Sequence, residues 1–246
     1  SIPELIEEVE YGITYFTERI EYNYNVDFDG RSIVGDNAYD INDRDYGNGD
    51  PSNRVKDESH GTHVAGIIAA ERNNGKGMNG VAKNVQIMSL RAVSNGDEYD
   101  KDIALAIRYA VDNGASIING SFGKSFSPNA EWVNEAIKYA ASKDVLFVHA
   151  AGNDGSNLDD PSNPNFPNDQ FNNEKEYANN VITIGALAAE YGPEMAADYS
   201  NYGRVNVDLF APGSGIYSTM PGSEYDYNDG TSMAAPHVSG AAALLW

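Results

Sequence analysis

The sequence predicts an α/β fold of three layers, in which a mostly parallel central sheet lies between helices. From His60 onward, short apolar segments alternate with segments of helical character. This alternation is typical of strand–helix–strand units, which build a parallel sheet covered on both faces. The chain has 246 residues, a length that suits one or two domains with a sizeable core. In such sheets, functional residues gather at the carboxyl ends of the strands.

The first quarter of the chain differs from the rest. Apolar residues recur every three or four positions over residues 2–20 and predict a helix. Residues 22–58 are rich in Asn, Asp, Gly and Tyr and predict a long loop, which at this length suggests an inserted excursion or a binding surface. We therefore divide the chain into an acidic helix-plus-loop insertion or extension, 1–59, and a main domain, 60–246.

The remaining elements follow from apolar runs and from helix start and stop signals. Ser127 and Pro128 are suited to the N-cap and first turn of a helix. Gly114 is suited to the end of the preceding helix. We expect helices at 61–70, 102–113, 127–142 and 231–246, and strands at 86–93, 116–119, 145–149, 181–185 and 205–210.

The composition excludes several functions. The 37 acidic and 16 basic residues give a net charge of −21, which argues against a nucleic-acid or anionic-membrane partner. The absence of cysteine excludes a disulfide scaffold, a thiol nucleophile and a Cys-ligated zinc site. No apolar run approaches the roughly 20 residues of a membrane span. No signal peptide opens the chain, and both ends look cut, because the first residue is Ser1 and the last residues stop inside an apolar run.

Two histidines, His60 and His63, begin an apolar segment of small residues. A metal pair is one interpretation, but the zincin pattern needs two His four residues apart with a Glu between them. The ordinary interpretation of each is a packed or capping histidine.

Ser232 begins the last predicted helix and is surrounded by small side chains, which leave room for a molecule to approach its hydroxyl. A serine at a helix start is usually an N-cap. A helix N-terminus also favours negative charge, and a serine nucleophile needs a neighbouring base.

Asn153 follows the strand predicted at 145–149 and lies in a glycine-rich turn. Asparagine is common in such turns because it tolerates a left-handed backbone. Its side-chain amide is also suited to donate a hydrogen bond to an oxyanion.

Taken together, three segments resemble the His, Asn and Ser signatures of the subtilisin-like serine proteases, in that family's order: His60 to Gly66, Ala150 to Asn153 and Gly230 to Pro236. The likeness covers residues 60–246. Shorter similar stretches lie between the signatures, at 80–82, 119–123, 200–203 and 211–213.

The resemblance implies a serine endopeptidase with a subtilisin-like fold. By this likeness His60 is the general base and later the general acid, Ser232 is the nucleophile, and Asn153 is an oxyanion donor together with the backbone N–H of Ser232. His63 and His237 become packing residues, and we expect His149 to be buried. The residues expected to flank the substrate pocket are Ser121, Phe122, Gly123, Ala150, Ala151 and Gly152.

The resemblance also implies polypeptide substrates, a monomer, and secretion or a cell-envelope location. No cofactor is required by this chemistry and no metal ligand is assigned. Structural calcium is compatible with the family and with an Asp-rich loop, but Asp43 to Gly47 does not fit the EF-hand spacing.

One element of the family pattern is missing. The family has an Asp directly after an apolar strand, before the His, and no aspartate of residues 1–59 has that setting; these are Asp27, Asp29, Asp36, Asp40, Asp43, Asp45, Asp50 and Asp57. Either the Asp strand lies upstream in a longer chain, or the protein is a degenerate homologue that binds peptides without cutting them. A third interpretation, a metal-dependent hydrolase, predicts chelator-sensitive activity that survives Ser232→Ala.

Overall fold

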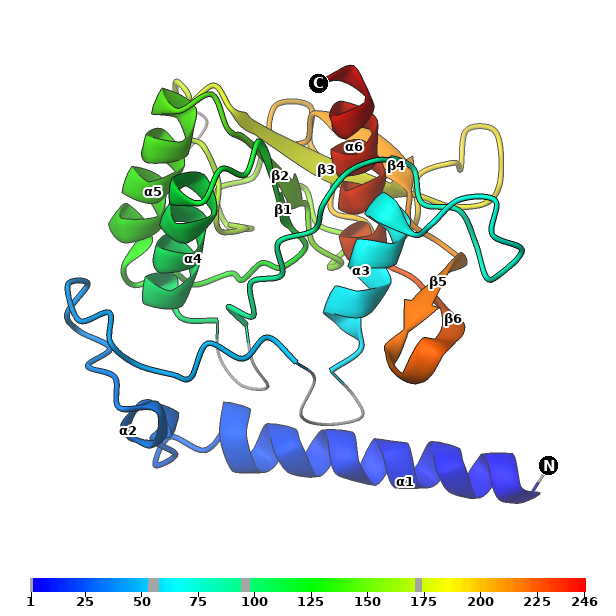
Figure 1. Ribbon diagram of the computed structural model, residues 1–246, viewed down its shortest axis with the longest axis horizontal. Coiled ribbons are helices and arrows are strands. Elements are labelled where there is room, and N and C mark those ends of the chain that lie inside the picture. Colours follow the sequence, from blue (N-terminus) through cyan, green and yellow to red (C-terminus); the bar gives the residue numbers. More distant parts are fainter. Residues whose placement is uncertain (1, 53–57, 94–97, 171–173) are drawn as a thin grey trace.

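A four-stranded parallel sheet forms the centre of the molecule (Figure 1), as the alternation of segments predicts. The computed structural model describes residues 2–52, 58–93, 98–170 and 174–246. In the sheet, Gly120 lies opposite His149. The residues that follow the first two strands therefore leave the sheet at the same level. The strands run in the order β1 Ile117–Gly120, β2 Leu146–Ala150, β3 Val181–Leu187 and β4 Leu209–Pro212.

Helices cover both faces of this sheet, which makes the predicted three layers. On one face, α4 (Asp100–Asp112) and α5 (Ala130–Ser142) bury an aliphatic core around Phe147. On the other face, α6 (Thr231–Leu245) packs on alternate residues of the same strands, such as Val148. Because parallel strands buried on both faces must be apolar on both sides, the sequence of β2 is an almost continuous apolar run.

Two of the expected local features are absent. Residues 86–93 form no strand: β1 is an edge strand, and no partner within the described residues pairs with its free edge. Without a ladder to bury them, Ile87 and Met88 remain exposed. Ser127 does not cap α5, because its hydroxyl donates to Asp100 and the residue before the helix is Asn129.

A hairpin that the sequence did not predict supports α3 (His60–Ala69). Its strands are β5 (Ile216–Met220) and β6 (Glu224–Asn228), joined by the 3₁₀ turn Pro221–Ser223. The side chain of Ser218 is buried and donates to the carbonyl of His63 at 2.7 Å. A polar residue that faces inward breaks the apolar alternation by which such strands are recognised.

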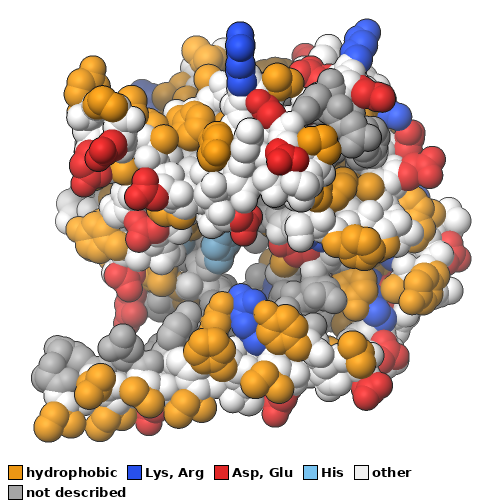
Figure 2. Space-filling model, turned by 180° about the vertical axis from the view of Figure 1, so that it is seen from behind, with side chains coloured by type: hydrophobic (Ala, Val, Ile, Leu, Met, Phe, Trp, Pro, Cys, Tyr) orange, Lys and Arg blue, Asp and Glu red, His pale blue; other side chains and the backbone are white. Residues whose placement is uncertain are grey.

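The amino-terminal segment consists of α1 (Ile2–Glu18), the π-helical turn Arg19–Asn23 and the short helix α2 (Gly30–Val34). The predicted first helix is confirmed, but its apolar stripe is exposed: Phe16, for example, retains 64% of its surface. Figure 2 shows this stripe as a row of hydrophobic side chains. The predicted loop is interrupted by α2, where the Asp29 carboxylate accepts the N–H groups of Arg31 and Ser32. No helix within the described ranges is long and apolar enough to cross a bilayer.

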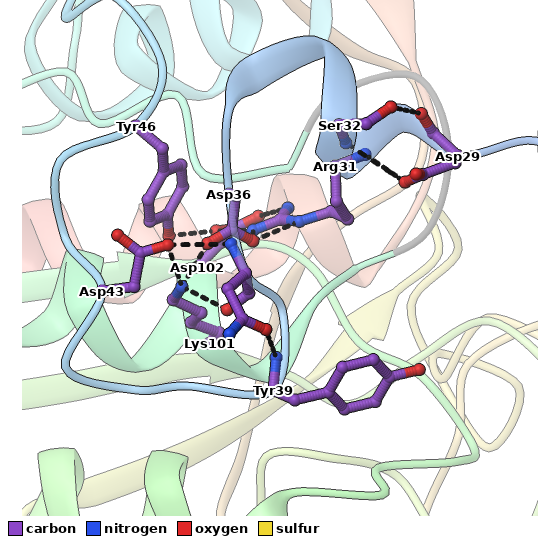
Figure 3. Close-up of polar contacts among 10 residues, drawn as sticks. Asp29, Arg31, Ser32, Asp36, Tyr39, Asp43, Tyr46, Lys101 and Asp102 are labelled. Carbon is purple, nitrogen blue, oxygen red and sulfur yellow. Dashed lines mark hydrogen bonds and ion pairs between the residues drawn. The ribbon is translucent and has the colours of Figure 1, made fainter.

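A buried ion cluster joins this segment to α4 (Figure 3). The Asp36 carboxylate is completely buried and contacts both the Lys101 ammonium and the Arg31 guanidinium. Arg31 also donates two hydrogen bonds to Asp102, at 2.6 and 2.9 Å, and the Tyr46 hydroxyl donates to the same carboxylate. Lys101 is only 1% exposed. Burial of its charge is unfavourable unless the charge is paired, and Asp36 is the carboxylate that pairs with it.

We expect Asp36→Ala to lower the free energy of unfolding by about 3 kcal/mol, because it leaves two cations without their buried counter-ion. The matched control is Glu135→Ala, which breaks an exposed ion pair with Lys138 and should cost less than about 1 kcal/mol. Urea unfolding followed by circular dichroism measures both. Equal losses in the two variants would contradict the structural role of the cluster.

Candidate active site

A cleft of about 1460 Å³ opens at the carboxyl ends of β1 and β2, and His60, Asn153 and Ser232 all line it. The N-terminal segment contributes Arg19 to the opposite side of the cleft. Figure 2 shows the hollow between this segment and the body of the molecule. Three residues from segments far apart in the sequence are therefore brought to one place.

Ser232 lies in the first turn of α6, where paired hydrogen bonds hold it against the end of β1. Its hydroxyl donates to the carbonyl of Ser121 at 3.3 Å, and the Ser121 hydroxyl donates to the carbonyl of Ser232 at 2.8 Å. Asn119 donates to the Ser121 hydroxyl and accepts from Ser239, about two turns further along α6. This network fixes the start of α6 relative to the sheet.

The Asn153 side chain has one possible orientation. Its Oδ1 accepts from the backbone N–H and from the hydroxyl of Thr231, each at 2.9 Å. Because a backbone N–H can only donate, the atom facing it must be the amide oxygen. The Nδ2 group is left as a donor beside Gly230, where an added Cβ would lie 3.4 Å from it.

A second donor lies next to this amide. The N–H of Ser232 belongs to the first turn of a helix, where backbone donors have no intrahelical partner. No hydrogen bond from it is found among the described residues. The Asn153 amide and this N–H therefore both lie beside Gly230, where an added Cβ would be 3.4 Å from the amide nitrogen and 3.7 Å from the nitrogen of Ser232.

His60 is the first residue of α3 and its side chain is exposed to the cleft. It makes no hydrogen bond or ion pair with a described carboxylate, and its ring is not hydrogen-bonded to Ser232. Desolvation by the surrounding protein and the nearby His63 lower the pKa of His60 below its ordinary value of 6.5. The imidazole is therefore neutral at neutral pH, the form that a general base requires.

None of the aspartates of the first segment is paired with His60 within the described residues. Asp36 and Asp43 are directed at Lys101, and Asp29 caps α2. Asp57 lies outside the described residues. The structure therefore places His60, Asn153 and Ser232 in one cleft, and no described carboxylate pairs with His60.

The comparisons with known proteins show the family to which the chain belongs. The model of the subtilase family matches residues 9–246, a range that includes most of the acidic segment. The chain belongs to the subtilase family.

This subtilase is 44% identical over 220 residues to the thermophilic serine proteinase of Bacillus sp. (strain AK1), covering 89% of the chain and 48% of that protein. It is 40% identical to thermitase of Thermoactinomyces vulgaris, covering 76% of the chain and 60% of the relative. The chain thus spans about half the length of the curated relatives it matches.

Solved structures give the same result for the fold. Sphericase superposes with a TM-score of 0.67 at 33% identity, over 78% of this chain and 64% of its own. A cold-adapted subtilisin-like serine proteinase gives 0.62 at 30% identity, over 90% and 71%. The subtilase fold of the chain is shown by these matches.

The other histidines of this subtilase are packed, as the sequence analysis expected. His63 is buried with its Nε2 facing the carbonyls of Ile216 and Asp226. His149 is buried, its Nε2 bonds to the Phe122 carbonyl, and desolvation lowers its pKa to about 4. His237 bonds to a carbonyl of its own helix. In the described ranges, no three His, Asp or Glu side chains gather where they could hold a metal ion.

The expected substrate-flanking residues divide into two groups. Ser121, Phe122, Gly123, Ala150 and Gly152 line the cleft, whereas Ala151 does not. Ala151 is fully buried, and its carbonyl accepts from Asn165 and Asn201. The Phe166–Pro167 peptide bond is cis.

Sequence analysis missed the role of Thr231, which is 1% exposed. Its hydroxyl donates to Asn153 and also accepts the N–H of Gly152 at 3.0 Å. A threonine between a glycine and the predicted nucleophile, in a run of small side chains, is the signal that could have revealed it.

Thr231→Val removes this hydroxyl and keeps the side-chain shape, and we expect it to slow labelling of Ser232 by a fluorophosphonate about tenfold. The loss corresponds to one hydrogen bond of about 1 kcal/mol at Asn153 and an unsatisfied N–H at Gly152. Thr231→Ser keeps the hydroxyl and should label within about twofold of the parent. Equal rates for the valine and serine variants would show that the hydroxyl does not orient the amide.

Proposed function

We propose that the protein is a serine endopeptidase. The Ser232 hydroxyl attacks the carbonyl carbon of a peptide bond while His60 takes its proton. The Asn153 amide and the Ser232 N–H stabilise the tetrahedral oxyanion. His60 then gives the proton to the leaving amine, and water hydrolyses the acyl-enzyme by the same two proton transfers.

The orientation of Asn153 is the observation that best supports this proposal. Two hydrogen bonds from Thr231 hold its oxygen, so the donor group is fixed before substrate arrives. An amide that served only as a turn residue would have no need of this anchoring. In subtilisin, loss of the corresponding amide costs about 10²–10³ in turnover.

The mechanism also needs a carboxylate beside His60, and the described residues do not supply one. We propose that a carboxylate from outside them orients the imidazole in the active protein. Without the family Asp, turnover in subtilisin falls by roughly 10⁴, so the 246-residue chain by itself would be feeble. The competing function is peptide binding: a module with the same fold would bind peptides in the cleft without cutting them.

We further propose polypeptide substrates, a monomer without a nucleic-acid or membrane partner, and no cofactor for hydrolysis. The strong negative charge supports the exclusion of nucleic acid. Structural calcium remains a proposal without a ligand set. Secretion or a cell-envelope location is also a proposal, since the relatives in Bacillus subtilis include a cell wall-associated protease and a major intracellular serine protease.

Covalent labelling by a fluorophosphonate tests the chemistry directly. We expect labelling of the parent chain and none of Ser232→Ala, with circular dichroism spectra that match. The full-length protein should cleave a denatured protein substrate in a Ser232-dependent manner. A folded full-length protein without such cleavage would favour the peptide-binding module, and chelator-sensitive cleavage that survives Ser232→Ala would favour a metal hydrolase.

The pH dependence of labelling reports the state of His60. Only the neutral imidazole accepts the Ser232 proton, and desolvation lowers the pKa of His60, so the base stays neutral to lower pH than usual. For the 246-residue chain, the acid limb of the labelling rate should have its midpoint below pH 6.5. A neighbouring carboxylate would raise this pKa, so a midpoint above 6.5 would reveal a partner for His60 within the chain.

A further inference from the structure

Within the described residues, the backbone that follows β1 is hydrogen-bonded to another backbone segment on one side only. Lys124 pairs its N–H and its carbonyl with Phe166, at 3.2 and 2.8 Å. In an extended segment, successive N–H groups point to opposite sides. The N–H of Gly123 therefore points away from Phe166, toward the open side of the segment, and Gly123 lines the cleft with His60 and Ser232.

A side chain already accepts this backbone donor. The Glu98 carboxylate lies 3.3 Å from the N–H of Gly123 and also lines the cleft. An extended peptide that adds to the free edge of residues 121–123 needs the same N–H for its main chain. Glu98 therefore occupies a position that a bound substrate would take, and binding displaces its carboxylate.

The cation beside the displaced carboxylate, Lys124, already has partners of its own. Its ammonium is held by the buried carboxylate of Asp100 at 2.7 Å and by the backbone carbonyl of Glu98. Glu98 also lines a small pocket with the apolar residues Phe122 and Pro167. Desolvation there raises the pKa of Glu98 to about 7, although the hydrogen bond from Gly123 and the charge of Lys124 both act to lower it.

We propose that Glu98 is a specificity-determining residue that selects a Lys or Arg side chain in the substrate, on the amino-terminal side of the bond to be cut. A basic side chain on the peptide that pairs with Gly123 supplies a cation when the carboxylate is displaced. A neutral peptide gains the same main-chain hydrogen bond but leaves the carboxylate unpaired. This inference rests on the proposed peptide-binding groove, and it names a substrate class rather than a chemical step.

Peptide binding tests the proposal without any need for turnover. We would measure affinities by fluorescence anisotropy for Ser232→Ala, using acetylated fluorescent peptides that carry Lys or norleucine at each of the positions before the cut. The two residues have stems of similar length and differ in the charge. At one position, Lys should bind about tenfold more tightly than norleucine, which corresponds to 1.4 kcal/mol, and added salt should weaken this preference.

Glu98→Gln in the same background keeps an oxygen that accepts from Gly123 and removes the charge. It should reduce the preference for Lys to within about twofold. Glu131→Gln is the matched control, because it removes one exposed carboxylate that does not line the cleft, and it should keep the full preference. Parallel circular dichroism confirms that the variants fold alike.

Three outcomes overturn the proposal: equal binding of Lys and norleucine peptides at every position, a preference that survives Glu98→Gln, or no saturable binding of either peptide. Failure of the endopeptidase function is a separate result. In that case the peptides bind with the expected preference, but the protein with Ser232 intact neither cleaves them nor reacts with a fluorophosphonate.

Discussion

The packing of the first turn of α6 against the carboxyl ends of β1 and β2 is the contact on which the site depends. The hydroxyl–carbonyl exchange between Ser121 and Ser232 joins the helix to one strand. The contacts of Thr231 with Gly152 and Asn153 join it to the next. One helix start therefore positions the hydroxyl and the N–H of Ser232 and the side-chain amide of Asn153. All of these contacts except the bond between the Thr231 hydroxyl and Asn153 involve a backbone group, so the geometry is set largely by the main chain.

His60 reaches the cleft by a separate route. The β5–β6 hairpin holds α3 through His63, and through hydroxyl donors on Ser218 and Thr219 that bond to carbonyls of the helix. The approach is close, since a Cβ at Gly66 would lie 2.2 Å from the Thr219 hydroxyl. His60 thus belongs to a different half of the site from Asn153 and Ser232, and no described carboxylate pairs with it.

The sequence was most informative where one local rule decided the structure. The signatures around His60, Asn153 and Ser232 gave the residues that share the cleft, and the apolar runs gave β1 to β3 within a few residues. It was least informative where the structure of a segment depends on residues that are far away in the sequence. Residues 86–93 have strand-like composition, but no described strand pairs with them, and Lys101 is a polar residue buried only because Asp36 folds back onto α4. Ala151 matched a family segment, yet its carbonyl is used inward by two asparagines.

The cleft is lined by backbone groups and by side chains, and the two contribute differently to the recognition of a peptide. Backbone donors such as the N–H of Gly123 are available to any peptide, because every residue of a substrate offers the same carbonyl. Discrimination must therefore come from side chains that a substrate displaces or pairs with. Arg91 is ion-paired with Glu58, and Lys124 with Asp100, so neither cation is left to compete for a substrate carboxylate. Glu98 instead accepts a hydrogen bond from the N–H of Gly123, which a bound peptide would also need. In our proposal the peptide displaces this carboxylate, and the side chain of the peptide decides whether the carboxylate gains a cation.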